Sequence, residues 1–444
     1  MIETAALLLW LANTWPYHLA AAFVAFYPMF TSVMWTFTSL VFYRRNERRP
    51  LPIAASDDDL PFVSVLVAAY CEEAVIKRTV ESLIAMNYPR DAYEIVIVDD
   101  GSTDRTCEIL APYVRQGQIR LVRKLQNEGK AMALNDAFPL LHGEIVVVVD
   151  ADIQTRPEVL RYMVPHFQSG RVAAVTGNPQ VTNTDSLLAK IQATEFASIV
   201  SVLRRAQRVW GRILTVSGAI TAFRKSAVVD VGLFDPEMAT EDIALAWKLQ
   251  RKFYDVRYEP RAVVAMQVPE GLGPLWRQRK RWALGLGQVL RKHATMFADW
   301  RTRRLWPVYV EACLSILWAY TVTVMVLFWG LSYAVGLEPL GASPLPNLWG
   351  MVIATAALLQ LGTGIWLDRH YNPGVTRFFF WAAMYPMFYW IVMTFITVLA
   401  TPRALFGKHQ HVTRWQTPRV PLLSAREQAL QEGVPFGELK TPAA

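Results

Sequence analysis

The chain has 444 residues, of which 53% are hydrophobic, and a formal net charge of +8. This length predicts two or three folding units. The basic charge does not indicate a nucleic-acid-binding protein, because arginines cluster at the ends of apolar runs, as at the cytoplasmic ends of membrane helices. Cys71, Cys107 and Cys313 lie far apart, so their spacing indicates neither a zinc site nor a disulfide framework.

Residues 1–43 are predicted to be the N-terminal membrane segment. No charged residue occurs over 19–43, which is longer than the about 20 helical residues that cross a bilayer. The earlier apolar run, 5–15, is short, and both a short span and an interfacial helix stay open for it. A polar linker, 44–60, begins with four arginines that place the next domain in the cytoplasm, although anchoring to anionic headgroups explains them equally well.

Residues 61–286 have the mixed composition of a soluble domain. Short apolar runs of strand type, 62–68, 94–98, 119–122 and 144–149, alternate with helical patterns over 73–86, 104–114 and 130–141. Further strands are expected over 172–177 and 215–223, and further helices over 184–208 and 241–251. The alternation predicts an α/β domain with a parallel sheet and helices on both faces. Ligands of such sheets bind at the carboxyl ends of the strands.

The C-terminal part returns to the membrane. We expect an interfacial amphipathic segment over 287–308, transmembrane helices within 309–401 and a basic tail over 402–444. Three apolar runs, 309–336, 348–367 and 378–400, are long enough to span. Three spans would place the tail outside the cell, whereas Arg403, Lys408, Arg414 and Arg419 favour the cytoplasmic side. The topology therefore stays open at this point.

Two acidic motifs stand at expected strand ends. Asp100, in Asp99-Asp100-Gly101, can accept hydrogen bonds from a uracil N–H or a ribose hydroxyl, although the turn also fits helix capping by Ser102. Asp150 and Asp152 directly follow a valine-rich strand. Two carboxylates there suit a hard divalent cation that fills its shell with substrate phosphates, and a solvated acidic turn is the alternative.

Two further motifs open or occupy expected helices. In Thr240-Glu241-Asp242, one carboxylate can act as a general base, whereas helix capping explains the same residues structurally. In the stretch 278–282, Arg281 can grip a diphosphate and Trp282 can stack on a sugar ring. The alternative for that stretch is contact with lipid headgroups.

In this order, the four motifs resemble those of the processive members of glycosyltransferase family 2, which make cellulose, chitin, hyaluronan and poly-N-acetylglucosamine. The resemblance covers nearly the whole chain. It implies a Rossmann-like GT-A domain in the cytoplasm, inserted between transmembrane helices. Stretches outside the shared motifs, 174–179, 215–218, 240–250 and 258–262, are most similar to bacterial poly-β-1,6-N-acetylglucosamine synthases.

The resemblance also implies a role for each motif residue. Asp242 is the expected catalytic base, and Asp152, with Asp150, is the expected ligand of Mg²⁺ or Mn²⁺. The remaining expected substrate-binding residues are Tyr70, Glu72, Asp100, Lys130, Glu241, Gln278, Arg281 and Trp282. The sequence departs from the family's Pro-x-x-Asn-Glu motif, because Ala68 and Cys71 stand in place of the proline and the asparagine.

The implied activity is inverting transfer from UDP-N-acetylglucosamine to a growing poly-β-1,6-N-acetylglucosamine chain, a biofilm exopolysaccharide, with passage through a membrane channel. The implied setting is the bacterial inner membrane, with a small membrane accessory subunit and activation by cyclic di-GMP. Three alternatives stay open: synthesis of another polysaccharide or a glycolipid, a silent membrane scaffold or nucleotide sensor, and a transporter. Against the transporter, we expect no paired repeats and no intramembrane acids in the C-terminal spans.

Overall fold

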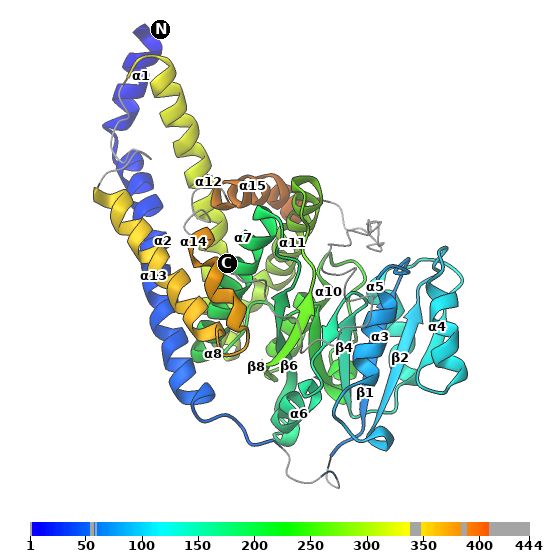
Figure 1. The fold of residues 1–444 in the computed structure, drawn as a ribbon. Helices are drawn as coiled ribbons and strands as arrows, with labels where there is room; N and C mark the ends of the chain where they lie inside the picture. Colours follow the sequence, from blue (N-terminus) through cyan, green and yellow to red (C-terminus); the bar gives the residue numbers. More distant parts are fainter. Residues whose placement is uncertain (1, 54–56, 58–59, 338–347, 383–388, 408–444) are drawn as a thin grey trace.

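The computed structural model describes residues 2–53, 57, 60–337, 348–382 and 389–407, and most of the expected basic tail lies outside these residues. An α/β domain carries a stalk of long apolar helices formed by both ends of the chain (Figure 1). The helices are α1 (Ile2–Ala12), α2 (Trp15–Phe42), α3 (Ile76–Ile84), α4 (Thr106–Arg115), α5 (Lys130–Ala137), α6 (Val159–Met163), α7 (Leu187–Glu195), α8 (Ser201–Trp210), α9 (Lys225–Asp230), α10 (Glu241–Arg251), α11 (Leu272–His293), α12 (Trp306–Ala334), α13 (Leu348–Asp368), α14 (Phe379–Ala382) and α15 (Trp390–Phe406).

An eight-stranded sheet of order β3-β2-β1-β4-β7-β6-β8-β5 forms the centre of the domain. Its strands are β1 (Val63–Ala69), β2 (Tyr93–Asp99), β3 (Arg120–Arg123), β4 (Ile145–Asp150), β5 (Gln154–Thr155), β6 (Val172–Val181), β7 (Ile220–Arg224) and β8 (Asp255–Met266). The expectation of a parallel sheet is correct for β1 to β4 and for β6 with β8. It is wrong for β7 and β5, which run antiparallel, because the chain enters β7 from the edge where β4 ends.

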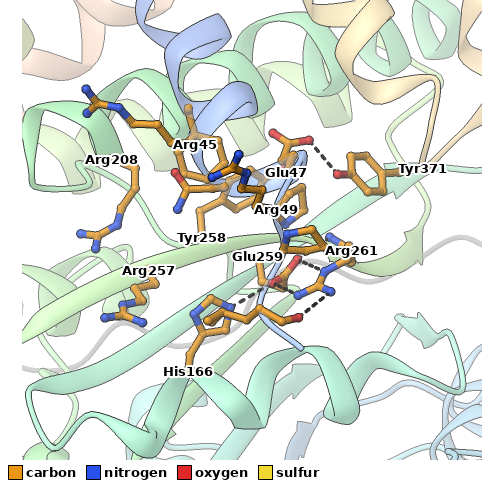
Figure 2. A pocket seen from close by; sticks show the side chains of 15 residues that line it. Arg45, Glu47, Arg49, His166, Arg208, Arg257, Tyr258, Glu259, Arg261 and Tyr371 are labelled. Atoms are coloured by element: carbon orange, nitrogen blue, oxygen red, sulfur yellow. Dashed lines mark hydrogen bonds and ion pairs between the residues drawn. The ribbon is translucent and has the colours of Figure 1, made fainter. Parts of the chain in front are cut away.

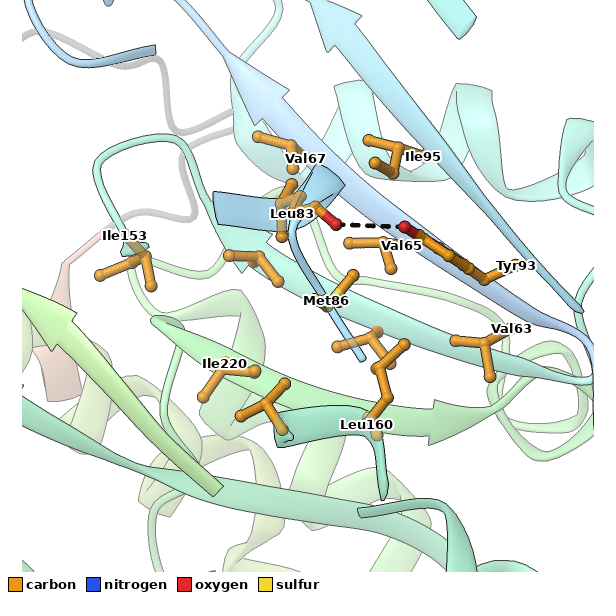
Figure 3. Packing of buried hydrophobic residues seen from close by; sticks show 14 of the residues in the cluster. Val63, Val65, Val67, Leu83, Met86, Tyr93, Ile95, Ile153, Leu160 and Ile220 are labelled. Atoms are coloured by element: carbon orange, nitrogen blue, oxygen red, sulfur yellow. Dashed lines mark hydrogen bonds between the residues drawn. The ribbon is translucent and has the colours of Figure 1, made fainter. Parts of the chain in front are cut away.

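The apolar side chains of the sheet alternate between two hydrophobic layers. On β1, Val65 and Val67 face one layer, whereas Leu66 and Ala68 face the other, as the two-residue period of a strand requires. The first layer packs under α3, and Figure 3 shows it around Val65, Leu83 and Ile153. The second layer packs under α5 and α10 and includes the end of α2. Burial on both faces fixes the strand register and therefore the strand ends.

Three helical segments are long and apolar enough to cross a membrane: Trp15–Glu47, Trp306–Ala334 and Gly350–Asp368. The short N-terminal run forms α1, whose end packs beside the far end of α12. The run 378–400 was expected to be one span, but among the described residues it contributes only α14 and the 17-residue α15. The expectation of no acid in the C-terminal spans is wrong, because Glu311 lies in α12.

Two helical segments that contact the long apolar helices differ from expectation. The expected helix over 184–208 runs as α7 and α8, with a π-helical turn, Phe196–Val200, between them. The segment expected to be amphipathic over 287–308 begins as the last two turns of α11, continues as two 3-10 turns, Ala294–Ala298 and Trp300–Arg304, and ends in the first turn of α12. Helix α11 begins at Leu272 and therefore also carries the 278–282 motif. Helix α15 lies along α11, and Arg291 donates a hydrogen bond to the carbonyl of Gly407 at 2.9 Å.

Candidate active site

Parallel pairing brings the expected acids to one edge of the sheet. Asp99 lies opposite Ala69, and Asp150 lies opposite Ala68, so β1, β2 and β4 end at the same level. Tyr70 and Glu72 follow β1 directly at this edge, and Asp100 follows β2. This is the edge at which ligands of such sheets bind.

Asp100 organises the loop that leads to Lys130. Its buried carboxylate accepts hydrogen bonds from the backbone N–H groups of Glu128, at 3.1 Å, and Gly129, at 2.7 Å. Gly129 has φ +91, a conformation that glycine adopts without a Cβ penalty. The Lys124 ammonium lies 3.4 Å from the same carboxylate. Asp100 therefore sets the position of the residue that reaches toward Asp150.

The loop after β1 rests on the loop after β2. The N–H of Cys71 donates to Ser102 Oγ at 2.9 Å, and the N–H of Glu72 donates to Thr106 Oγ1 at 2.9 Å. Cys71 has φ +55, in the left-handed region where asparagine is several-fold enriched. The asparagine that the family resemblance implies at this position would suit such a backbone, and this chain has a cysteine there. The side chain of Glu72 is buried, whereas that of Tyr70 is partly exposed.

Lys130 joins the end of β4 to the start of α10. Its ammonium lies 2.5 Å from Asp150 Oδ1 and 2.9 Å from Glu241 Oε1. Burial disfavours the charge of Lys130, but Asp150, Glu241 and Asp242 outweigh burial and hold the pKa of Lys130 above its ordinary value. A Cβ placed on Gly218 would lie 3.2 Å from Asp242 Oδ2 and 3.5 Å from Asp150 Oδ2. The two aspartates therefore border one narrow space.

The neighbouring acids Glu241 and Asp242 have pKa values shifted in opposite directions. Burial disfavours the charge of Glu241, but Lys130 and Arg281 outweigh burial, so the pKa of Glu241 is lowered. Burial, and then the charge of Glu241, raises the pKa of Asp242 to about 6. Divergent pKa values in adjacent carboxyls are typical of acid–base sites. Asp242 is thus the carboxylate with an affinity for a proton near neutral pH.

Asp152 lies beyond the end of β4, where it is partly exposed. Its charge acts on Asp150, which places the two carboxylates near one another. No cluster of three His, Cys, Asp or Glu side chains that suits a metal occurs among the described residues. The carboxylates of Asp150 and Asp152 therefore fit a hard cation shared with a phosphate ligand, and not one enclosed by protein alone.

Helix α11 brings the 278–282 motif next to Thr240. Arg281 donates to the carbonyl of Ala239 at 3.0 Å, and Gly285 leaves the space that the side chain of Thr240 occupies. The Oε1 atom of Gln278 is buried and has no hydrogen-bond partner within the described part of the chain. Trp282 is partly buried among apolar residues of α7 and α13. Arg281 is thus the residue of the 278–282 motif whose charge acts on Glu241.

Two buried arginines at this site were missed in the sequence. Arg204 of α8 donates to the carbonyl of Gly177 at 3.3 Å, and its charge acts on Asp242. Arg279 lies 4.2 Å from the ring centre of Trp282 and pairs with Glu195 at 2.6 Å. Arg279 stands inside the 278–282 motif, which assigns it no role of its own, and Arg204 stands in no motif; both lie in basic stretches that also suit a surface.

Comparison with known proteins places these features in a family. The family described as "Glycosyltransferase like family 2" matches residues 61–285. Poly-β-1,6-N-acetyl-D-glucosamine synthase of Staphylococcus aureus (strain COL) is 34% identical over 408 residues, which cover 89% of this chain and 97% of that protein. The synthase of the same name from Staphylococcus epidermidis (strain ATCC 35984) is 32% identical over 406 residues, with the same coverage.

Among solved structures, a mannosyltransferase from Pyrobaculum calidifontis in complex with GDP-Man and Mn²⁺ superposes with a TM-score of 0.58 at 23% identity. The match covers 86% of this chain and 99% of that one, and it supports the GT-A-like fold. The chain is therefore an enzyme that transfers sugars, and it belongs to glycosyltransferase family 2.

Proposed function

We propose that the chain is a membrane-bound, processive, inverting glycosyltransferase that polymerises N-acetylglucosamine from UDP-N-acetylglucosamine into poly-β-1,6-N-acetylglucosamine. The proposal is supported by the similarity to polysaccharide synthases along most of the chain. The observation that carries the chemistry is the Glu241–Asp242 pair beside Lys130, in which the carboxyl of Asp242 has its pKa raised to about 6.

In the proposed reaction, Asp242 removes the proton from a hydroxyl of the terminal sugar of the growing chain. The hydroxyl oxygen bonds to the anomeric carbon of the donor sugar from the face opposite the UDP. The bond between that carbon and the diphosphate oxygen breaks, and UDP leaves with the bonding electrons. Lys130, beside Asp150, and Arg281, beside Ala239, are the proposed cations that neutralise the leaving diphosphate. Tyr70, Glu72 and Asp100 line the uridine side, and Gln278 and Trp282 the acceptor side.

Asp150 and Asp152 are the proposed ligands of Mg²⁺ or Mn²⁺. A divalent ion there supplies charge neutralisation for the departing diphosphate. Two carboxylates would hold such an ion only together with oxygens of the substrate and water, as is usual for magnesium in proteins. Metal removal by a chelator is expected to abolish transfer, and activity that persists at full rate would contradict this role.

The product is tested by supplying membranes that contain the chain with different radiolabelled UDP-sugars. Incorporation from UDP-N-acetylglucosamine into a polymer cut by a β-1,6-specific glycosidase is expected. A polymer cut by chitinase, or label from UDP-glucose or UDP-glucuronic acid, would assign the chain to chitin, cellulose-like or hyaluronan synthesis. Label confined to lipid would indicate a glycolipid transferase. Absence of transfer with every donor would support a silent scaffold.

For topology, we propose that α2, α12 and α13 cross the bacterial inner membrane, with the catalytic domain in the cytoplasm. With the N-terminus outside, α2 leads into the cytoplasm, α12 leads out of it, and α13 leads back into it. Arg403 and the basic residues after it then obey the positive-inside rule. Helix α15 would lie along α11 at the membrane surface, beside the channel that receives the polymer. A C-terminal tag is expected to resist external protease in intact spheroplasts.

The proposal also includes a small membrane accessory subunit and activation by cyclic di-GMP, both from the family resemblance alone. Full activity of the purified single chain without the nucleotide would contradict both. Nucleic acid is not among the proposed partners, because the arginines concentrate around the ends of the membrane helices.

A further inference from the structure

Two adjoining cavities lie at the amino-terminal half of β8, the opposite end of the strand from the edge that carries the acids. The first has a volume of about 330 Å³, and Figure 2 shows its basic residues, which are Arg45, Arg49, Arg208, Arg257 and Arg261. The second, also of about 330 Å³, shares Arg208 and Arg257 and adds Arg171, Arg212 and Arg304. These eight arginines and the two cavities are here named the arginine groove. None of them belongs to the candidate active site.

The arginine groove contains fewer acids than arginines: the acids that line it are Glu47, Asp255 and Glu259. Asp255 pairs with Arg208 at 2.6 Å and also contacts Arg257. Glu259 pairs with Arg261, and Glu47 is held by a buried arginine outside the groove, Arg205. No acidic partner within the described ranges contacts the other arginines, which are Arg45, Arg49, Arg171, Arg212 and Arg304. An excess of positive charge therefore remains in a concave space.

Arg212 is buried close to other positive charges of the groove. It is 7% exposed, and its Nε has no hydrogen-bond partner among the described residues. Burial lowers the pKa of Arg212, and the charges of Arg304, Arg208 and Arg171 lower it further, against the attraction of Asp255. One nitrogen of the group, Nη1, donates to the carbonyl of Gly211 at 2.8 Å, so the guanidinium keeps further N–H donors for an anion in the cavity that it lines. Arginine forks match the oxygens of phosphate groups in particular.

The arginine groove lies close to the apolar surface of the membrane helices. Phe37 of α2 is 66% exposed and precedes Arg45 by eight residues, which is about 12 Å along a helix. Trp300 is also 66% exposed and precedes Arg304 by four residues. An exposed apolar residue such as Phe37 suits the hydrocarbon, and tryptophans such as Trp300 are enriched at the boundary between hydrocarbon and headgroups. With α2 and α12 crossing the membrane as proposed above, the groove would open near the level of lipid phosphates on the cytoplasmic side.

We propose that the arginine groove binds a phosphate-bearing anion, with the headgroup of an anionic membrane lipid as the expected source. The ligand would join three parts of the chain that are distant in sequence: the end of α2, the start of α12 and strand β8. Its negative charge would relieve the repulsion among the arginines. This binding is independent of the proposed sugar chemistry, since its measurement needs no turnover.

The chain offers a matched pair of variants. Arg45→Gln with Arg49→Gln removes two exposed arginines that line the groove and pair with no acid among the described residues. Arg44→Gln with Arg48→Gln removes two exposed arginines from the same segment, at the same spacing, that do not line the groove. Both double variants lose the same charge. A difference between them therefore distinguishes a specific binding site from general attraction to an anionic surface. Thermal melts establish that both fold.

The experiment is native mass spectrometry of the purified full chain in detergent, titrated with phosphatidylglycerol or with phosphatidylcholine. We expect retained phosphatidylglycerol in the parent and in the 44/48 variant, and at least about tenfold weaker binding in the 45/49 variant. Equal weakening in both variants, or equal binding of the two lipids, would overturn the proposal. A third arm titrates inorganic pyrophosphate. Binding of pyrophosphate that is lost in the 45/49 variant, without phosphatidylglycerol binding, would keep the phosphate site and assign a soluble source.

Discussion

The ammonium of Lys130 lies 2.5 Å from Asp150 Oδ1, which ties the start of α5 to the end of β4. The same ammonium contacts Glu241 at 2.9 Å, so one cation bridges two acids that are distant in sequence. Asp100 holds the backbone immediately before this lysine. Three of the four sequence motifs thus meet through one side chain, and Arg281 adds the fourth beside Glu241.

Lys130→Met is expected to reduce sugar transfer by at least about 10²-fold, because the diphosphate loses a preorganised cation. Asp150 and Glu241 would also face one another without a counter-ion, so the affinity for UDP should fall. The measurements are initial rates with labelled donor and UDP binding by calorimetry. Lys77→Met removes a lysine whose side chain is 65% exposed, and we expect parental activity from it. Parental rates from the Lys130 variant would exclude Lys130 from the diphosphate site.

The raised pKa of Asp242 predicts the pH dependence of transfer. The base must be ionised, so the rate should rise as pH increases through about 6, and fall about tenfold for each pH unit below that value. Glu241→Gln removes the neighbouring negative charge that raises this pKa, and the acid limb should therefore move to lower pH. The measurement is a rate profile between about pH 5 and pH 8. An acid limb at the same pH in both proteins would contradict the coupling.

Asp242→Asn is the companion variant, with a predicted loss of nearly all transfer at every pH. The pKa of this carboxyl is about 6 in the folded state, above its ordinary value of 3.8. Its ionisation therefore lowers the stability of the fold as pH rises between these two values. The asparagine variant should consequently be at least as stable to heat as the parent at neutral pH. Loss of activity with retained stability separates a catalytic defect from unfolding. Substantial transfer by this variant would instead reject the base assignment.

Gly218→Ala tests the narrow space between the two aspartates. The new Cβ would lie 3.2 Å from Asp242 Oδ2, closer than most Cβ contacts, and 3.6 Å from the Lys130 ammonium. We expect at least about a tenfold loss of transfer, because a small displacement of a catalytic group is costly, and little change in the melting temperature. Gly170→Ala is the control, since a Cβ there meets nothing within 4 Å. Equal activity in both variants would show that transfer does not depend on the space between Asp150 and Asp242.

The fold was predictable where apolar runs are short and continuous. Strand β4 follows from five consecutive apolar residues before Asp150, and its burial on both faces fixes where that aspartate stands. Strand β8 was missed because Glu259, Pro260 and Arg261 interrupt its apolar pattern. Glu259 is tolerated in the interior because Arg261, at 2.8 Å, and His166, at 2.9 Å, both contact its carboxylate.

The site was predictable only in part, for a related reason. Asp100, Asp150 and Asp242 stand in motifs, and the family resemblance assigns them roles. Arg204 stands in no motif, and the 278–282 motif assigns no role to Arg279, because burial of an arginine depends on partners far away in the sequence. Glu195, the partner of Arg279, lies 84 residues earlier. Local pattern cannot distinguish an arginine that faces lipid headgroups from one that turns inward.

Arg279 is therefore the most informative residue for a positioning role at the acceptor side. Its guanidinium is enclosed by Trp282 at 4.2 Å, by Tyr389 at 5.8 Å and by Phe196 at 5.9 Å, while its charge meets Glu195. Cation–π contact of this kind fixes the plane of an indole ring. If Trp282 stacks on the acceptor sugar, a change at Arg279 should act through the orientation of that ring.

Arg279→Met is expected to destabilise the fold by about 3 kcal/mol, because Glu195 would stay buried without its cation. Adding Glu195→Gln should recover part of that stability, since the double variant leaves no unpaired buried charge. The kinetic defect should not recover in the same way. The double variant should keep a raised KM for the acceptor, because Trp282 still lacks the cation that orients its ring. Thermal melts and acceptor titrations of the single and double variants provide the two readouts. A double variant with parental KM would restrict Arg279 to a structural role, and Lys280→Met, on the exposed side of the same helix, should change neither quantity.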